Sequence, residues 1–292
     1  MIRTAKPDIL LTNDSSADLL SVIIAAHNEE AYIGSCLESL LMQDQTAGRV
    51  IVIVAANACT DQTEKAVHDK KENFARRGWQ LKLLSIEAPG KLNAFNHADR
   101  AAVGTMRVYL DADVICNPEL LGQLRGALNK SKPIYATGTL EVAPAKSWVT
   151  RAYANLWVQL PFMKGGCVGA GLFAVNALGR ERWGPFPSII SDDTFVRMNF
   201  APDERIEVPA RYQWPMVEGF RNLVQVRRRQ DTGVSEVERL YPDLIKNDTK
   251  TALSKGELFK IFLKTPISFT VYAIVHLFVR LREGGAEWTR GR

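Results

Sequence analysis

The chain has 292 residues, of which 46% are hydrophobic and 24% charged, with 37 Lys and Arg against 32 Asp and Glu. This ordinary globular composition excludes an intrinsically disordered chain, a collagenous fibre and a disulfide-stapled miniprotein. The basic excess lies in the last quarter, because residues 221–292 hold 14 basic and 8 acidic side chains. A nucleic-acid-binding stripe over the main body is therefore not supported, and we expect no nucleic-acid partner.

The first 18 residues are polar and aperiodic, which predicts an N-terminal tail. Aspartates at positions 8, 14 and 18 interrupt any apolar signal region, so we expect the main domain to face the cytoplasm. The four cysteines are scattered, with no C-x-x-C pair and no clustering with histidine. They are therefore expected to be reduced and mostly buried, without a zinc site.

A strand followed by a helix repeats from residue 19 onward. Residues 19–26 form a continuous apolar run, typical of a strand buried on both faces, and apolar residues recur at helical spacing over 33–41. Similar strands are expected at 50–54, 81–86 and 106–110. This alternation predicts an α/β fold with a mostly parallel central sheet.

Polar residues follow each of these strands where the strand ends. They are His27–Glu30, Asn57–Thr63, Pro89–Lys91 and Asp111–Asp113. Ligands of parallel sheets bind outside the carboxyl ends of the strands. The sequence therefore predicts one nucleotide-sized site at this edge.

The regular alternation of strands and helices becomes less clear after Pro118. A helix near 118–130, a strand near 134–140 and an aromatic helix around 148–160 precede a segment, 165–171, with four glycines in seven residues. Such glycine density indicates a tightly turning backbone or one that approaches a ligand closely. The acidic pair Asp192-Asp193 and the basic run 227–229 follow.

Several of these polar residues suggest chemistry. Asp111 and Asp113 suit a hard divalent cation that bridges substrate phosphates, although such a pair also caps turns. Lys91 opens a predicted helix, where free N–H groups and a cation favour phosphate, unless it is a solvent-facing lysine. The adjacent carboxylates of Asp192 and Asp193 raise each other's proton affinity and suit a general base toward a hydroxyl, or else begin a helix.

Taken in order over residues 20–230, the motifs resemble the family-2 inverting glycosyltransferases of the GT-A fold. Residues 21–30 are similar to the opening S-V-I-I-P-x-Y-N-E-E, with Ala25 for the proline and His27 for the tyrosine. Residues 57–63 are similar to D-G-S-T-D-G-T, with Asn57 where an aspartate meets the uracil ring.

Two further motifs complete the donor side. Residues 90–96 match the diphosphate element G-K-x-x-A-x-N, and Asp111-Ala112-Asp113 matches D-x-D. The resemblance implies that Asp113 binds the metal, Mn²⁺ or Mg²⁺. It implies nucleotide-sugar contacts for Ala26, Asn28, Glu29, Asn57, Asp61, Lys91, Asn96, Asp111 and Arg228.

The acceptor side resembles the family as well. The glycine-rich segment is similar to its acceptor-side loop, which implies acceptor contacts for Gly169, Ala170, Gly171 and Trp183. Residues 191–193 resemble S-E-D, so Asp193 is the implied general base, with Asp192 as the neighbouring catalytic carboxylate. Residues 225–229 are similar to Q-x-x-R-W of processive synthases, but Arg229 replaces the tryptophan, which favours a non-processive enzyme.

The resemblance thus implies a metal-dependent inverting glycosyltransferase. It would move a sugar from a nucleotide diphosphate sugar, in the first place a UDP-sugar, to a hydroxyl of a saccharide or lipid-linked acceptor. The alternatives are a processive polysaccharide synthase, a sugar nucleotidyltransferase and a catalytically inactive membrane scaffold. An acidic segment without glycine after the first strand, His27–Glu30, disfavours the nucleotidyltransferase.

The C-terminal segment 257–282 predicts membrane association. Its apolar stretch 265–281 has 17 residues, about 25 Å as a helix, which is short for a bilayer core of roughly 30 Å. Flanking Lys and Arg with interleaved aromatic residues favour a helix lying at the headgroup boundary, on the cytoplasmic face of the membrane. The alternatives are a buried helix and a true span. We expect a tail (1–18), a GT-A domain (19–230, with donor half 19–117 and acceptor half 118–230) and a C-terminal helical extension (231–292).

Overall fold

The fold is described from a computed structural model, which covers residues 18–163, 167–248 and 253–281. The expected tail up to residue 17, two of the clustered glycines (Gly165 and Gly166) and Arg282 lie outside the described residues.

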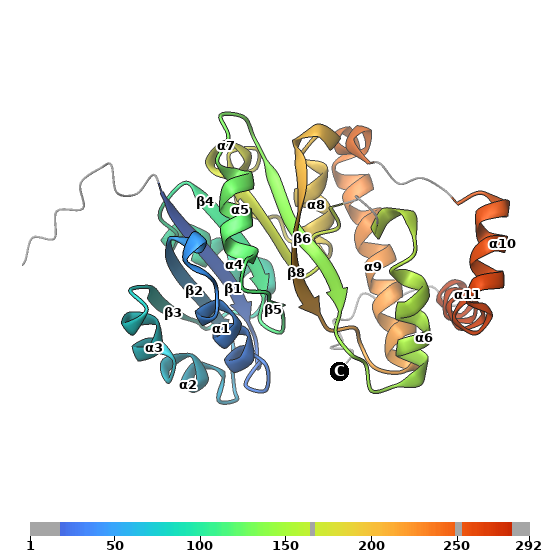
Figure 1. Cartoon of the computed structure of the whole chain (residues 1–292), viewed down its shortest axis with the longest axis horizontal. Coiled ribbons are helices and arrows are strands. Elements are labelled where there is room, and N and C mark those ends of the chain that lie inside the picture. Colours follow the sequence, from blue (N-terminus) through green and yellow to red (C-terminus); the bar gives the residue numbers. More distant parts are fainter. Residues whose placement is uncertain (1–17, 164–166, 249–252, 282–292) are drawn as a thin grey trace, which may run out of the picture.

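One eight-stranded sheet runs through the molecule in the order β3-β2-β1-β4-β7-β6-β8-β5 (Figure 1). The first four strands in this order are parallel, β7 is antiparallel to both of its neighbours, and β6 is parallel to β8. The expected α/β class with a mostly parallel sheet is therefore confirmed. The strands are β1 Leu19–Ala26, β2 Arg49–Asn57, β3 Gln80–Ile86, β4 Met106–Asp111, β5 Ile115–Cys116, β6 Tyr135–Val142, β7 Leu172–Asn176 and β8 Arg205–Trp214.

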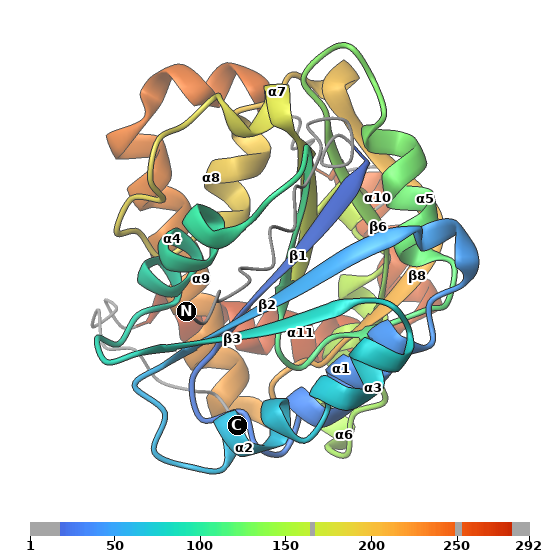
Figure 2. The same cartoon turned by 90° about the vertical axis from the view of Figure 1, so that its left-hand side faces the viewer.

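Helices cover both faces of the sheet. Side chains of α1, α2, α3 and α5 pack on one face, and those of α4 and α8 pack on the other. Figure 2 shows the end of the sheet formed by β1–β3, with α1–α3 beside it. The helices are α1 Ile33–Leu41, α2 Thr63–His68, α3 Lys71–Arg76, α4 Lys91–Ala101, α5 Leu120–Leu128, α6 Trp148–Trp157, α7 Ala177–Arg180, α8 Asp192–Met198, α9 Phe220–Leu240, α10 Lys255–Lys264 and α11 Pro266–Arg280, with short 3₁₀ turns η1 Gln45–Ala47, η2 Pro161–Met163, η3 Pro202–Glu204 and η4 Pro242–Asn247.

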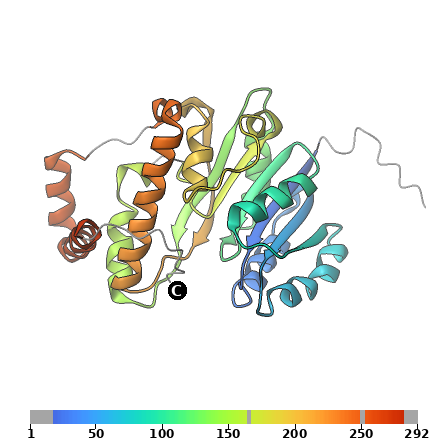
Figure 3. The same ribbon diagram turned by 180° about the vertical axis from the view of Figure 1, so that it is seen from behind.

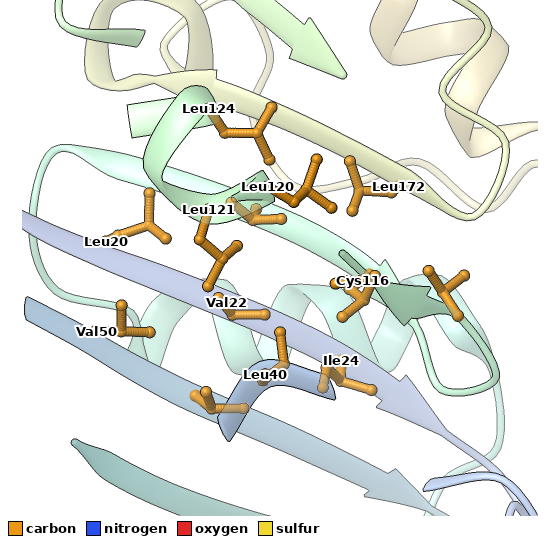
Figure 4. Packing of buried hydrophobic residues seen from close by; sticks show 14 of the residues in the cluster. Leu20, Val22, Ile24, Leu40, Val50, Cys116, Leu120, Leu121, Leu124 and Leu172 are labelled. Atoms are coloured by element: carbon orange, nitrogen blue, oxygen red, sulfur yellow. The ribbon is translucent and has the colours of Figure 1, made fainter. Parts of the chain in front are cut away.

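The continuous apolar run of β1 follows from burial on both faces. Leu20, Val22 and Ile24 point toward α1 and α5, as Figure 4 shows, whereas Ile23 packs on the α4 side. Because the side chains of a strand alternate between faces, a strand covered by helices on both sides must be apolar throughout. The buried central strands therefore position the loops that leave the carboxyl edge of the sheet.

The long helix α9 connects several parts of the molecule. It contacts α6, α8 and α11, and Figure 3 shows it from behind. A third apolar cluster fills the space among α6, α9 and α11 and is distinct from the two clusters on the faces of the sheet. The helices α10 and α11 lie at the outer edge of the molecule, beyond α6 and α9 (Figure 1).

The C-terminal segment forms two helices instead of one. Thr265 ends α10, and Pro266 occupies the first turn of α11. A proline has no N–H to donate and clashes with the preceding turn, so it is tolerated at a helix start and interrupts a helix interior. Within the described ranges, we find no helix with both the length and the apolarity required to cross a bilayer.

Candidate active site

The loops after β1 and β2 are tied to each other by hydrogen bonds. The Asn28 side-chain oxygen accepts from the Thr60 N–H at 2.7 Å, and the Asp61 carboxylate accepts from the Glu30 N–H at 3.2 Å. The Thr63 hydroxyl accepts from the Glu29 N–H at 2.6 Å. Desolvation raises the pKa of Asp61, but the hydrogen bonds that it accepts, above all from the Thr63 hydroxyl and N–H, outweigh this effect and lower the pKa. The predicted donor edge thus brings together Asn28, Glu29 and Asp61. Asp61 holds the loops after β1 and β2 together.

Asn57 links three segments at this edge. Its side-chain N–H donates to the Ala26 carbonyl at 2.8 Å, and its side-chain oxygen accepts from the Gly90 N–H at 3.0 Å. Ala26 ends β1, Asn57 ends β2 and Gly90 precedes α4, so one buried amide fixes the relative positions of all three. The oxygen keeps a second lone pair, and the expected contact of Asn57 with a nucleobase remains a prediction.

Lys91 joins the donor side to the acceptor side. Its Nζ lies 2.9 Å from Asp111 Oδ1 and 3.1 Å from Asp192 Oδ2. Asp111 ends β4, whereas Asp192 begins α8, about 80 residues later in the chain. The two carboxylates raise the pKa of Lys91 and outweigh its desolvation, so the lysine stays charged. Lys91 and Asp111 thus lie at one edge, as the sequence predicted, and the structure adds Asp192, which the sequence could not place there.

Asp113 lies in the turn after β4 and is 9% exposed. In residues 18–163, 167–248 and 253–281, no three or more Asp, Glu, His or Cys side chains gather closely enough to chelate a cation by themselves. Mg²⁺ and related ions are commonly held by one or two carboxylates together with substrate phosphates and water. Asp113, with Asp111 two residues away, matches such a site, which needs a phosphate to complete it.

Asp193 lies at the start of α8, where its carboxylate accepts from the Thr194 N–H at 2.7 Å. Burial and the charge of neighbouring Asp192 raise the pKa of Asp193 to about 6. A carboxylate with a pKa near neutrality is a stronger base than an ordinary aspartate and is still mostly ionised at neutral pH. This environment suits the role that the sequence motif implies.

The glycine-rich loop contacts the end of β4 directly. The Gly171 carbonyl accepts from the Asp111 N–H at 2.8 Å, and the Ala170 carbonyl accepts from the Tyr212 hydroxyl at 2.9 Å. Gly169 and Gly171 adopt φ values of 65° and 74°, which favour glycine. This segment therefore lies beside Asp111, and the expected acceptor contacts of Gly169, Ala170 and Gly171 remain predictions.

Asn96 is engaged with backbone. Its side chain donates to the Phe186 carbonyl at 3.0 Å and accepts from the Phe186 N–H at 2.6 Å. Both hydrogen-bonding groups of the amide are used, so Asn96 holds the segment that leads to Asp192 and Asp193. Its expected direct contact with the nucleotide sugar remains a prediction.

Arg228 is placed differently from the sequence expectation. Its guanidinium donates to the carbonyl of Val279 at 3.3 Å and to that of Phe278. Free carbonyls and the dipole at a helix C-terminus attract a cation, and α11 ends here. The structure therefore assigns Arg228 to the attachment of α11 and gives no support to its expected donor contact.

Trp183 also differs from expectation. It is 8% exposed and packs edge-on against Phe186, Phe195 and Phe200, with the Arg180 guanidinium over its ring. An indole enclosed by aromatic rings is a core residue, so the structure does not support the expected acceptor contact of Trp183. In the sequence, Trp183 follows the glycine-rich loop closely. The spacing alone does not reveal that strand β7, which lies between them, leads the chain away from this loop.

Sequence reasoning missed the role of Gly233 in α9. A Cβ at this position would lie 2.4 Å from the Ser191 hydroxyl, so α9 touches the segment just before Asp192. Glu236, one turn later, accepts from the Ile190 N–H at 2.8 Å. At about 100° per residue, Arg229 lies roughly 40° from the direction of Gly233 and Arg228 roughly 140° away. Arg229 is therefore the arginine of the run on the face toward α8.

The fold and the site together define a glycosyltransferase of the GT-A type. A sheet edge that carries D-x-D, a lysine at a helix start and an acidic pair from α8 is the arrangement that the motifs predicted. The family model described as glycosyl transferase family 2 matches residues 21–176, more than half of the chain. The chain belongs to this family.

Comparisons with individual proteins agree. A putative glycosyltransferase of Bacillus subtilis, EpsH, is 29% identical over 105 residues, which cover 36% of this chain and 29% of the relative. The match thus spans less than a third of that relative. Among solved structures, S. aureus TarS 1–349 with UDP-GlcNAc superimposes with a TM-score of 0.53 at 17% identity, covering 89% of this chain and 81% of that one. The mannosyltransferase PcManGT of Pyrobaculum calidifontis, with GDP-Man and Mn²⁺, gives 0.55 at 21% identity, covering 88% and 70%. At these identities, the two structures support the fold.

Proposed function

We propose that this glycosyltransferase moves a sugar from a UDP-sugar to a hydroxyl of a saccharide or lipid-linked acceptor, with inversion and without processive elongation. The observation that carries the proposal is the position of Lys91, which contacts the donor-side Asp111 and the acceptor-side Asp192 at once. Donor phosphates bound at Lys91 would therefore lie next to the acidic pair that can deprotonate an acceptor. The replacement of the processive tryptophan by Arg229 supports single transfers.

Charge balance supports a divalent cation, Mn²⁺ or Mg²⁺. Four carboxylates, Asp111, Asp113, Asp192 and Asp193, come from the β4 end and the α8 start, and Lys91 bridges two of them. A diphosphate approaching such a cluster would be repelled unless further positive charge entered with it. Asp113 would hold the ion, which when bound neutralises charge on the departing nucleotide diphosphate. The GDP-Man complex of the similar mannosyltransferase, which contains Mn²⁺, supports this proposal.

The residues of this chain supply positioning and proton transfer. Lys91 binds the diphosphate, and the backbone of the Asn57–Asp61 loop frames the nucleoside. Asp193 accepts the proton of the acceptor hydroxyl as that oxygen attacks the anomeric carbon from the face opposite the diphosphate. The bond to the diphosphate oxygen breaks in the same displacement, so the configuration inverts and no covalent intermediate forms. Fixed geometry and electrostatics supply most of the acceleration.

A thermal-shift panel of UDP, GDP and ADP, each with and without Mn²⁺ or Mg²⁺, tests the donor assignment. A ligand that binds the native state stabilises it by about 2.7 kcal/mol at a concentration one hundred times its Kd. We expect UDP with a divalent cation to give the largest rise in Tm. The absence of a shift with every nucleotide would refute the proposal, and a preference for GDP would refute the uridine assignment alone.

We propose that α10 and α11 dock on the cytoplasmic face of a membrane. One side of α11, including Val275 and Val279, is buried against α6 and α9. The opposite side exposes apolar side chains, with Ile267 70% and Leu281 65% accessible, and α10 adds Leu263 at 63%. Lys255, Lys260, Lys264 and Arg280 accompany a single acidic residue, Glu257, on the two helices. Exposed apolar side chains with a cationic rim fit the headgroup region of an anionic bilayer.

The aromatic residues of the two helices differ in their accessibility to lipid. Phe269 and Tyr272 pack toward the body, and Tyr272 stacks on Tyr153 with ring centroids 5.0 Å apart. Phe259 is 60% exposed and Phe262 39% exposed, so both remain available. A protein docked in this way would meet lipid-linked acceptors in two dimensions, which supports that class of acceptor.

Co-sedimentation with vesicles tests the membrane proposal. We expect binding to vesicles that contain phosphatidylglycerol, weak binding to pure phosphatidylcholine, and release by salt. Ile267→Asp should reduce binding, since it places a charge in the apolar face while remaining compatible with a helix start. Met42→Asp is the matched control, because Met42 is also 70% exposed but lies after α1. Equal binding by both variants, or self-association of the protein through this face, would refute the docking.

A further inference from the structure

Lys91 is held by two carboxylates, one from each side of the site. Asp111 is the closer partner at 2.9 Å, and its side chain is 31% exposed. Asp192 is more deeply buried, with a side chain that is 9% exposed. Lys91 supplies both the ion pair and the hydrogen bond that the Asp192 carboxylate makes within the described residues, at 3.1 and 3.3 Å.

We propose that Asp192 is a positioning residue that holds Lys91 in a resting position, and that the lysine exchanges Asp192 for the donor diphosphate when the donor binds. This inference rests on the proposed function. Nζ carries three N–H donors, and its side chain remains 41% exposed, so it can turn toward the open edge of the site. Asp192 would thus compete with the donor for one cation.

The exchange has a consequence for the acceptor side. An ion pair with one partner removed leaves the remaining buried charge uncompensated, which is unfavourable. After Lys91 moves, Asp192 and Asp193 are two adjacent carboxylates with less nearby positive charge, and like charges at close range favour a shared proton. Arrival of the donor would therefore increase the tendency of this pair to accept the proton of an acceptor hydroxyl. The geometry links donor binding to acceptor activation through a single lysine.

A double-mutant cycle on nucleotide affinity tests the exchange. The Kd of UDP with Mn²⁺ is measured by titration calorimetry for the wild type, Asp192→Asn, Lys91→Met and the double variant. If Asp192 competes for Lys91, Asp192→Asn should bind UDP about fivefold or more tightly, and this gain should disappear in the Lys91→Met background. A gain in affinity is not expected from structural damage. Asp192→Ser carries the same expectation and serves if Asp192→Asn fails to fold.

Asp193→Asn is the matched control, since it removes an equal charge from the adjacent residue, which forms no salt bridge with Lys91 in the described part of the chain. Equal gains for Asp192→Asn and Asp193→Asn that persist without Lys91 would indicate general electrostatics and overturn the exchange. Unchanged or weaker binding by folded Asp192→Asn and Asp192→Ser would overturn it as well. If the wild type binds none of UDP, GDP and ADP, the proposed function itself fails.

Discussion

The donor side and the acceptor side of the site are held in place by different means. On the donor side, hydrogen bonds between neighbouring loops fix the backbone, as in the contacts of Asn28 with Thr60 and of Asp61 with Glu30. On the acceptor side, close packing contributes more to fixing the backbone. A Cβ at Gly169 would lie 1.9 Å from the Tyr135 hydroxyl, and one at Gly171 would lie 2.5 Å from the Trp214 ring.

This difference indicates how each half can change. A hydrogen-bonded loop can keep its shape when a new side chain still makes the required bonds, and the donor loops depart from the family pattern at His27 and Asn57, both of which are hydrogen-bonded. Packed backbone tolerates no added atom where a glycine meets a neighbour. We therefore expect substitutions on the acceptor side to have the larger effects on transfer.

The largest effect is expected at Asp193. In Asp193→Asn, an amide cannot accept the proton of the acceptor hydroxyl, so transfer should fall by about 10³-fold, within the range for loss of a general base. Binding of UDP should persist, because the donor loops are untouched. Release of the nucleotide diphosphate measures transfer, and calorimetry measures binding. Normal turnover by this variant would remove Asp193 from its assigned role.

The same residue should set a pH dependence. Burial and Asp192 raise the pKa of Asp193 to about 6, and only the ionised form acts as a base. We expect kcat/KM to fall about tenfold per unit below pH 6, and Asp193→Asn to lack this decline. Because the pKa in the folded state lies above the ordinary value of 3.8, ionisation of Asp193 destabilises the fold as pH rises from about 4 to 6. Unfolding of Asp193→Asn should therefore lose this pH-dependent contribution.

Gly233 offers an intermediate effect that acts through packing alone. A Cβ there would lie 2.4 Å from the Ser191 hydroxyl and 2.8 Å from Ile190, so Gly233→Ala should push α9 away from the segment that carries Asp192 and Asp193. We expect a loss of about 1–3 kcal/mol in the free energy of unfolding, as for other overpacked sites, and about tenfold slower transfer. Urea denaturation and the transfer assay measure the two effects.

The matched control is Gly126→Ala in α5. Apart from its chain neighbours and the backbone of its own helix, no atom of the described residues lies within 4 Å of a Cβ at this glycine. The substitution should therefore stabilise the helix by roughly 0.5–1 kcal/mol through propensity. Transfer should be unchanged. If Gly233→Ala behaved like Gly126→Ala, the acceptor side would not depend on close packing.

The donor half was the more predictable from sequence for the same physical reason. Strands β1 to β4 are continuous apolar runs that end in polar motifs, and each lies within a few residues of its predicted position. The polar loops are local in sequence, so their convergence followed from the topology of a parallel sheet alone. The expectation that one edge of the sheet carries the donor residues therefore required no knowledge of contacts between residues far apart in the sequence.

The acceptor half depends on contacts that pattern does not encode. The sequence of the run 227–229 does not indicate which arginine faces α8, because this depends on how α9 is rotated about its own axis. In the structure, the close approach of Gly233 to Ser191 shows which side of α9 faces α8. Trp183 was assigned from its place after the glycine loop, whereas aromatic packing buries it. Pro266 in the sequence indicates the break between α10 and α11. The packing of α11 against α6 and α9 could be seen only in the structure.

The smallest effect is expected at Ala58, on the donor side. Its φ is +46°, a left-handed conformation that disfavours an alanine, and the family pattern has glycine at this position. Ala58→Gly should stabilise the protein by about 1 kcal/mol, because the Cβ is removed from a strained backbone. Ala75→Gly, at an exposed position of helix α3, should instead destabilise it by roughly 0.5–1 kcal/mol.

The two substitutions are chemically identical, so the opposite signs isolate backbone strain as the cause. Urea midpoints measure both, and UDP binding shows whether the strain serves the site. If Ala58→Gly gains stability but binds UDP more weakly, the strained loop pre-organises the donor side, since a glycine would allow it to relax. If both variants lose stability, the Asn57–Thr63 loop is not strained, and the hydrogen bonds that Asn28 and Asp61 accept from its N–H groups account for its shape.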